Sequence, residues 1–130
     1  DVEGWDAATK LLILASVLMG GDKGLEDLDI EVITSIKYED IERALKEGKR
    51  YKLIARAYLV DGDIRLKVGP ELIGSDNPLY YVKGKNKAVR YITDTLGDLT
   101  VAGGASGVVP AAASILRDMI NIHRGYRYIR

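Results

Sequence analysis

Apolar residues recur at steps of three and four along residues 5–19, and this period predicts an amphipathic helix. The apolar stripe consists of Trp5, Ala8, Leu11 or Leu12, Ala15 and Met19. Gly20 and Gly21 follow the stripe and supply the flexible residues that end helices. Residues 22–29 are polar and form a loop after this first helix.

The same period predicts two further helices, over residues 39–47 and over residues 109–123. Their predicted buried stripes are Ile41, Ala44 and Leu45 in the first, and Ile115, Met119 and Ile122 in the second. Pro110 suits the first turn of the last helix, because a proline there gives up no helical hydrogen bond. His123, at the end of that helix, is predicted to be a surface or capping residue.

Strands are predicted where the pattern alternates. Residues 51–60 alternate, Asp-Gly-Asp follows at 61–63, and a second strand covers 64–68, which together indicate a hairpin. One face of the first strand carries Leu53, Ala55, Ala57 and Leu59, and the other carries Lys52, Arg56 and Tyr58. We expect the apolar face to be buried and the polar face to lie in water or against a partner. Pro70 is expected to end the second strand.

Shorter strand candidates lie at 30–33, and at 86–93 with 99–102. Helices at both ends and in the middle, with two strand pairs joined by short turns, predict an α+β fold. We expect a mixed, largely antiparallel sheet of roughly four strands with the helices packed on one face. The length of 130 residues suits a single domain, 1–130.

Charge and composition narrow the function classes. Nineteen basic and nineteen acidic residues cancel, so the sequence offers no electrostatic case for nucleic acid or a membrane as partner. The absence of cysteine suits a reducing interior, and a single histidine cannot form a histidine metal cluster, so we expect a cytoplasmic protein without a metal. Because the chain opens at Asp1 with no cap or strand before its first helix, we expect it to be part of a longer protein.

The candidate chemistry lies at the start of the first helix. Asp6 and Lys10 are one turn apart on one face, so their charged groups can meet, and Asp1 is close enough in sequence to fold back toward them. The plain alternative is a solvated surface pair that contributes about 0.2–0.5 kcal/mol to stability. Spacing by itself favours that alternative.

A glycine-rich turn, Gly103 to Gly107, precedes the last helix. Such a turn allows close approach of a ligand, and a helix N-terminus favours negative charge. The turn is not a P-loop, since no Lys-Ser or Lys-Thr follows, and no acidic residue completes a dinucleotide fingerprint. A tight turn that simply requires small residues is the alternative.

The order of several motifs resembles the catalytic domain of homoserine dehydrogenases. The motifs are D-x-x-G-x-D-x-A-x-K at Asp1 to Lys10, the Tyr-Lys-Leu-Ile-Ala-Arg-Ala strand at 51–57, Asn86-Lys87-Ala88-Val89, Thr93-Asp94 with Gly97, and the glycine turn leading into an alanine-rich helix. The resemblance implies an oxidoreductase that interconverts L-homoserine and L-aspartate 4-semialdehyde with NAD or NADP, and that forms a homodimer through its sheet. In that family a Rossmann domain precedes this one.

Residue by residue, the resemblance implies that Lys10 is the proton donor. It implies that Asp1 and Asp6 hold the substrate and position that lysine, and that Gly107 touches the nicotinamide cofactor. Ala111 stands where the family has a threonine, and the glycine turn is looser than the family's. Two other hypotheses are a non-catalytic amino-acid-binding or oligomerisation module and a purely structural scaffold, which would leave Asp1, Asp6 and Lys10 unclustered.

Overall fold

The computed structural model describes residues 4–84, 86–104 and 106–127. The chain divides into two compact units, residues 1–80 and residues 81–130. The elements of the first unit are α1 (Trp5–Leu18), η1 (Leu25–Asp27), β1 (Leu28–Ile30), η2 (Ile33–Ser35), α2 (Tyr38–Lys46), β2 (Arg50–Val60) and β3 (Asp63–Ile73). A 3₁₀ helix, η3 (Pro78–Tyr81), lies at the boundary, and the second unit contains β4 (Lys87–Thr93), β5 (Gly97–Gly103) and α3 (Val108–His123).

The first unit has a three-stranded mixed sheet in the order β1-β3-β2. β2 and β3 form a long antiparallel hairpin, and β1 runs parallel to β3 with Leu28 opposite Leu66. The hairpin turns at Asp61 and Gly62, whose φ angles are 51° and 82°. Positive φ at both central residues suits the right-handed twist of the two strands, which is why Asp-Gly stands there.

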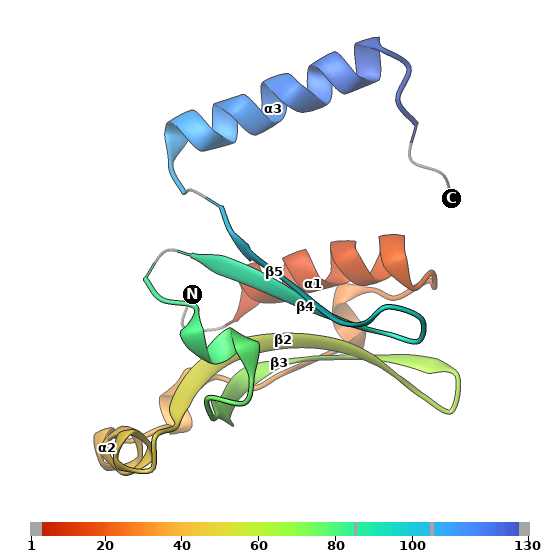
Figure 1. The fold of residues 1–130 in the computed structure, drawn as a ribbon. Coiled ribbons are helices and arrows are strands. Elements are labelled where there is room, and N and C mark those ends of the chain that lie inside the picture. The colour runs from red at the N-terminus through yellow and green to blue at the C-terminus, as the bar shows by residue number, and fades with distance from the viewer. Residues whose placement is uncertain (1–3, 85, 105, 128–130) are drawn as a thin grey trace. The chain divides into compact units, whose positions relative to one another are not determined.

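The core of this unit lies between α1 and the sheet (Figure 1). Its buried residues come from three small or branched positions of the helix and two of β3: Ala8, Leu11, Ala15, Leu66 and Val68. The alanines let the helix lie close to the strands, because their side chains take little space. The two ends of the apolar stripe lie outside this core, since Trp5 is 51% and Met19 37% exposed.

α2 begins one residue before its predicted start, and of its predicted stripe only Ala44 is buried. Ile41 and Leu45 are 41% and 55% exposed, so the stripe was wrong there. The helix spans nine residues and contacts β2, and Ala44 is its only residue that is buried among those the structure describes.

Two strand predictions need correction. The strand expected at 30–33 lies at Leu28–Ile30, and residues 33–35 form a 3₁₀ turn instead. β3 also continues through Pro70 to Ile73 rather than ending at the proline. The parallel pairing with β1 stops at Val68, so Pro70 lies beyond it on the open side of the strand, where a missing N–H removes no ladder bond.

The second unit is a hairpin followed by a helix. β4 and β5 pair in antiparallel register from Lys87 opposite Gly103 to Thr93 opposite Gly97. The sequence predicted this strand pair, but β5 begins two residues before and ends one residue after the predicted strand at 99–102. The Thr93 hydroxyl closes the turn by donating to the Gly97 carbonyl at 3.0 Å and accepting from the Leu96 N–H at 3.0 Å. The apolar stripe predicted for α3 is exposed, at 62% for Ile115 and Met119 and 74% for Ile122.

These elements confirm the α+β fold class, with a mixed sheet and an antiparallel pair. Five strands are described where roughly four were expected. α1 covers one face of the three-stranded sheet and α2 lies against β2. In the part of the chain that the structure describes, every helix is too short or too polar to cross a membrane.

Candidate functional site

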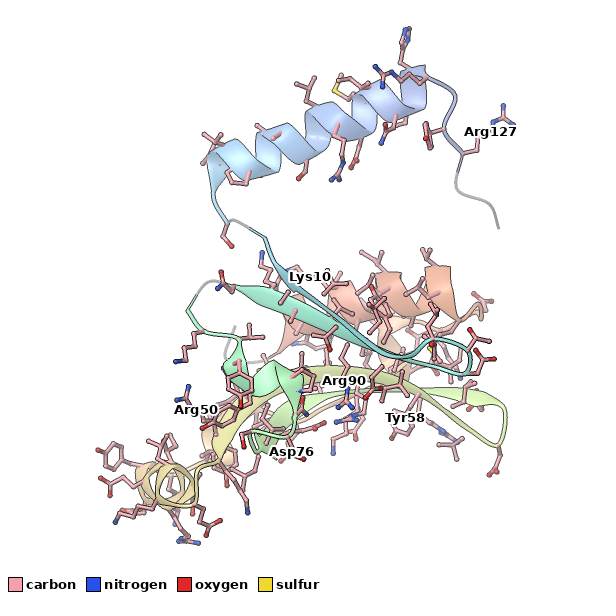
Figure 2. All side chains as sticks on the ribbon, in the orientation of Figure 1. Lys10, Arg50, Tyr58, Asp76, Arg90 and Arg127 are labelled. Atoms are coloured by element: carbon pink, nitrogen blue, oxygen red, sulfur yellow. The ribbon has the colours of Figure 1, made fainter. Side chains whose placement is uncertain are left out.

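α1 holds Asp6 and Lys10 on the side of the helix that faces away from the sheet. Ala8, Leu11 and Ala15 are buried on the sheet side, and a step of 100° per residue places Asp6 and Lys10 opposite them. The Lys10 Nζ donates a hydrogen bond to Asp6 Oδ2, so the structure brings together the two residues that the spacing paired. Figure 2 shows Lys10 on this helix.

The pair is open to solvent in this chain. The side chain of Lys10 is 57% exposed and that of Asp6 is 68% exposed. Water therefore screens their mutual attraction, and the pair contributes only a few tenths of a kcal/mol to folding, about 0.2–0.5 kcal/mol. A pair that adds so little to stability can be replaced without unfolding the protein.

The backbone around the pair is fixed by local hydrogen bonds. The Gly4 carbonyl accepts from the Ala8 N–H at 2.9 Å and so opens the helix. The Thr9 hydroxyl donates to the Trp5 carbonyl at 2.9 Å. Asp6 lies in the first turn, where the partial positive charge of the helix N-terminus favours a carboxylate.

The other two predicted site residues are Asp1 and Gly107. Asp1 lies outside the described residues, so its place beside Asp6 and Lys10 stays a prediction. Gly107 belongs to the second unit, where it is exposed and precedes α3. Its φ of 130° favours glycine, and its carbonyl accepts from the Ala111 N–H at 3.1 Å. Apart from its chain neighbours, none of the described residues has an atom within 4 Å of the place where a Cβ would stand.

Gly4 belongs to the motif at residues 1–10, but no separate role for it was predicted from the sequence. The structure buries this residue directly beneath the helix start, in a left-handed conformation with φ 77°. The signal in the sequence was a glycine placed immediately before the first apolar residue of a regular helix. A glycine there points to a special backbone angle or to a close approach.

A second ion pair was also missed, because its partners are far apart in sequence. Lys23 Nζ lies 2.9 Å from Asp63 Oδ1 and connects the loop after α1 to the β2–β3 hairpin. The hydrogen bond from Lys23 lowers the pKa of Asp63, and the same bond raises the pKa of Lys23. This contact joins the loop after α1 to the start of β3.

The fold and the exposed pair define an α+β domain that presents a carboxylate and an ammonium group on one helix. Comparison with known proteins identifies the family. The sequence profile described as homoserine dehydrogenase matches residues 1–120, and the chain belongs to the homoserine dehydrogenase family.

Relatives of known sequence and structure agree with this assignment. The chain is 35% identical over 125 residues to an NAD(+)-dependent homoserine dehydrogenase of Pseudomonas canavaninivorans, covering 95% of this chain and 36% of the relative. The crystal structure of a homoserine dehydrogenase from Thiobacillus denitrificans superposes with a TM-score of 0.88 at 32% identity, covering 95% of this chain and 29% of that one.

A third comparison concerns a protein with a bound nucleotide. A hyperthermophilic archaeal homoserine dehydrogenase mutant in complex with NADPH matches with a TM-score of 0.76 at 28% identity, over 100% of this chain and 36% of that one. The chain thus spans about a third of the length of the relatives that it matches.

Proposed function

We propose that this chain is the substrate-binding, catalytic part of an enzyme that interconverts L-homoserine and L-aspartate 4-semialdehyde. The reaction belongs to the biosynthesis of threonine, methionine and isoleucine. The observation that carries the proposal is the hydrogen-bonded pair of Lys10 and Asp6, within the segment that matches the family. An exposed pair on a helix is ordinary by itself, and the family match is what gives it a catalytic meaning.

Lys10 is the proposed proton donor. Reduction of the aldehyde leaves negative charge on its oxygen, and the Lys10 ammonium stabilises that charge and transfers a proton to the oxygen. In the reverse direction the neutral amine takes the proton from the alcohol. Asp6 accepts a hydrogen bond from Lys10 Nζ, which fixes the direction of the side chain.

Asp1 and Asp6 are the proposed substrate ligands. The substrate carries an α-ammonium group, which a carboxylate binds through a charge-assisted hydrogen bond. Because Asp6 already accepts from Lys10, we assign Asp1 to the α-ammonium and Asp6 to both the lysine and the substrate. The two carboxylates then hold the substrate so that its aldehyde oxygen lies next to the lysine.

The proposed cofactor is NAD or NADP, and Gly107 is its contact in this chain. When bound, the nicotinamide supplies the hydride that reaches the carbonyl carbon. The surroundings of Gly107 fit such a contact, because the residue is exposed and open space surrounds the missing Cβ.

The open position of Lys10 leads us to expect that this chain alone is inactive. An ammonium group that is 57% exposed acts in a medium close to water, where electrostatic stabilisation of developing charge is weak. In the family a nucleotide-binding domain supplies the cofactor, and we propose that it also excludes water from the lysine. The alternative, a non-catalytic amino-acid-binding or oligomerisation module, requires neither a cofactor nor the exclusion of water from the lysine.

Steady-state kinetics of a full-length enzyme carrying this chain test the proposal. Lys10→Ala is expected to lower kcat by about 10²–10⁴-fold, the usual contribution of a positioned acid or base. KM should change much less, because the ammonium is needed most where charge develops. Asp6→Asn should also slow turnover, by releasing the lysine from its hydrogen-bond acceptor.

The matched control is Arg43→Ala on α2. Arg43 is 71% exposed and pairs with Asp40 at 3.6 Å, so it too is an exposed helical ion pair. Melting curves should place all three variants close to the wild type, and only the α1 variants should lose turnover. Wild-type turnover in Lys10→Ala would refute the catalytic assignment and leave the non-catalytic module.

We further propose that the two units act as one catalytic domain, 1–130, and that the protein is a cytoplasmic homodimer. The family profile runs through both units, which supports a single functional domain. The sheet face opposite α1 suits a partner, because Arg56 and Glu71 already pair there at 2.5 Å and Tyr58 is 41% exposed. Charges paired within the subunit can be covered at smaller cost than unpaired ones.

Light scattering at high protein concentration tests the dimer. Tyr58→Asp should give the mass of one chain, because it replaces an aromatic ring with a charge that the partner would have to desolvate. Tyr38→Asp is the control, since Tyr38 is 72% exposed in the first turn of α2, where a carboxylate is tolerated. A wild-type mass equal to one chain would contradict the dimer.

A further inference from the structure

Gly4 lies at the start of α1, where its backbone runs close to the side chains of Ile30 and Val68 in the sheet. The residue is buried, with φ 77° and ψ 2°, and its carbonyl accepts the first hydrogen bond of the helix from the Ala8 N–H. Residues with a Cβ adopt this left-handed conformation only at a cost. Glycine therefore meets one requirement of this position through its backbone angle alone.

The short distance between this backbone and the sheet is a second and separate reason for glycine at position 4. A Cβ on residue 4 would lie 3.2 Å from Cγ2 of Ile30 and 3.3 Å from Cγ1 of Val68. These two residues are partners in the register of β1 and β3. Distances this short require a neighbour to shift by a few tenths of an ångström.

Val68 has little freedom to shift. Its relative exposure is 0%, and it belongs to the buried cluster with Ala8 and Leu11 of the same helix. A closely packed interior transmits such a displacement instead of absorbing it. The first turn of α1 would move away from the sheet, and Asp6 and Lys10 would move with it.

We propose that Gly4 is a positioning residue for Lys10: it sets the height of the first turn of α1 above the β1–β3 pair, and so the place of the Lys10 ammonium. This inference rests on the proposed function, in which that ammonium must meet the aldehyde oxygen. Gly4 itself touches neither substrate nor cofactor. Its effect on the reaction passes through the backbone of residues 5–10.

Gly48 provides the matched control. It follows the C-cap of α2 with φ 70°, close to the angle of Gly4. Within the described part of the chain, only its sequence neighbours come within 4 Å of its missing Cβ. Gly48→Ala therefore introduces the backbone strain without the contact. Gly4→Ala introduces both, so the difference between the two variants isolates the close approach to Ile30 and Val68.

The experiment measures kcat, KM and melting temperature in a full-length enzyme carrying this chain. Both glycine variants should melt at lower temperature than the wild type. At a temperature where all are folded, Gly4→Ala should lower kcat about tenfold with a much smaller change in KM, since a displacement of about 1 Å can cost 10²-fold and this one is smaller. Gly48→Ala should keep the wild-type kcat.

Val68→Ala tests the mechanism in a second way. Combined with Gly4→Ala it removes one of the two close contacts, so the double variant should recover most of the lost kcat while remaining less stable. If Gly4→Ala does not fold, Val68→Ile adds a methyl group at the same contact and should lower kcat in its place. Wild-type kcat in the folded Gly4→Ala, or in Val68→Ile where that is the variant used, overturns the inference.

The Lys10→Ala variant, measured in the same series, separates this inference from the proposed function. Loss of turnover in Lys10→Ala with wild-type kcat in Gly4→Ala removes the positioning role alone. Wild-type turnover in Lys10→Ala removes both, because no proton donor then remains to be positioned. A fall of kcat in Gly48→Ala as large as in Gly4→Ala would also refute the role, by assigning the effect to strain.

Discussion

Truncation of Leu66 tests whether α1 lies on the sheet as described. Leu66 is in the middle of β3 and is 3% exposed, within the cluster that includes Ala8 and Ala15 of the helix. Leu66→Ala should lower the free energy of unfolding by about 2–5 kcal/mol. We expect the upper half of that range, because the facing alanines have no side-chain rotamers with which to fill the space.

Urea unfolding of the chain, followed by circular dichroism, measures this change. Leu59→Ala is the control: Leu59 lies on β2 on the same face as Ala57, but it is 62% exposed. Its truncation should change the free energy of unfolding by less than about 0.5 kcal/mol. If Leu66→Ala cost less than about 1 kcal/mol, or no more than Leu59→Ala, the packing of α1 on β3 would be refuted.

Two further predictions concern the end of the β2–β3 hairpin. The pKa of Asp63 is lowered by its hydrogen bond from Lys23, so this pair stabilises the fold above the carboxyl's ordinary pKa of 3.8, and the stabilisation is lost as pH falls through the lower, folded-state value. In melting curves recorded from neutral pH to pH 2, Asp63→Asn should therefore reduce the fall of melting temperature at acid pH. The same fall in the variant as in the wild type would contradict this prediction. At the turn, Gly62→Ala should lower the free energy of unfolding by about 1–2 kcal/mol, because φ at this position is 82°. Asp61→Gly should be tolerated, so equal melting temperatures for the two variants would contradict the turn geometry.

Local patterns predicted the elements well because they depend on neighbours in sequence. The bounds of α1 and the pairing of Asp6 with Lys10 follow from helical spacing, and the β2–β3 hairpin follows from alternation around Asp-Gly. The continuation of β3 through Pro70 could not be predicted in this way. It depends on where β1 stops pairing, and β1 is distant in sequence.

Burial was harder to predict than secondary structure. A period of 3.6 residues shows which side of a helix is apolar, but it does not show what covers that side. Ile115 in α3 is apolar and 62% exposed in this chain, as is Ile13 in α1 at 60%. Likewise the family resemblance named Lys10 and Gly107 as parts of one site, a relation between distant residues that no local pattern contains.

The mixed pairing of β3 implies an order of events during folding. The contacts between β2 and β3 close across a two-residue turn, so this hairpin can form first at little entropic cost. The parallel contact of Leu28 with Leu66 closes a much longer loop that contains α2 and all of β2. α1 packs against residues of both β1 and β3, and it can dock fully only after that loop has closed. The helix that carries Lys10 is thus among the last elements of this unit to reach its place, although it comes before the hairpin in the sequence.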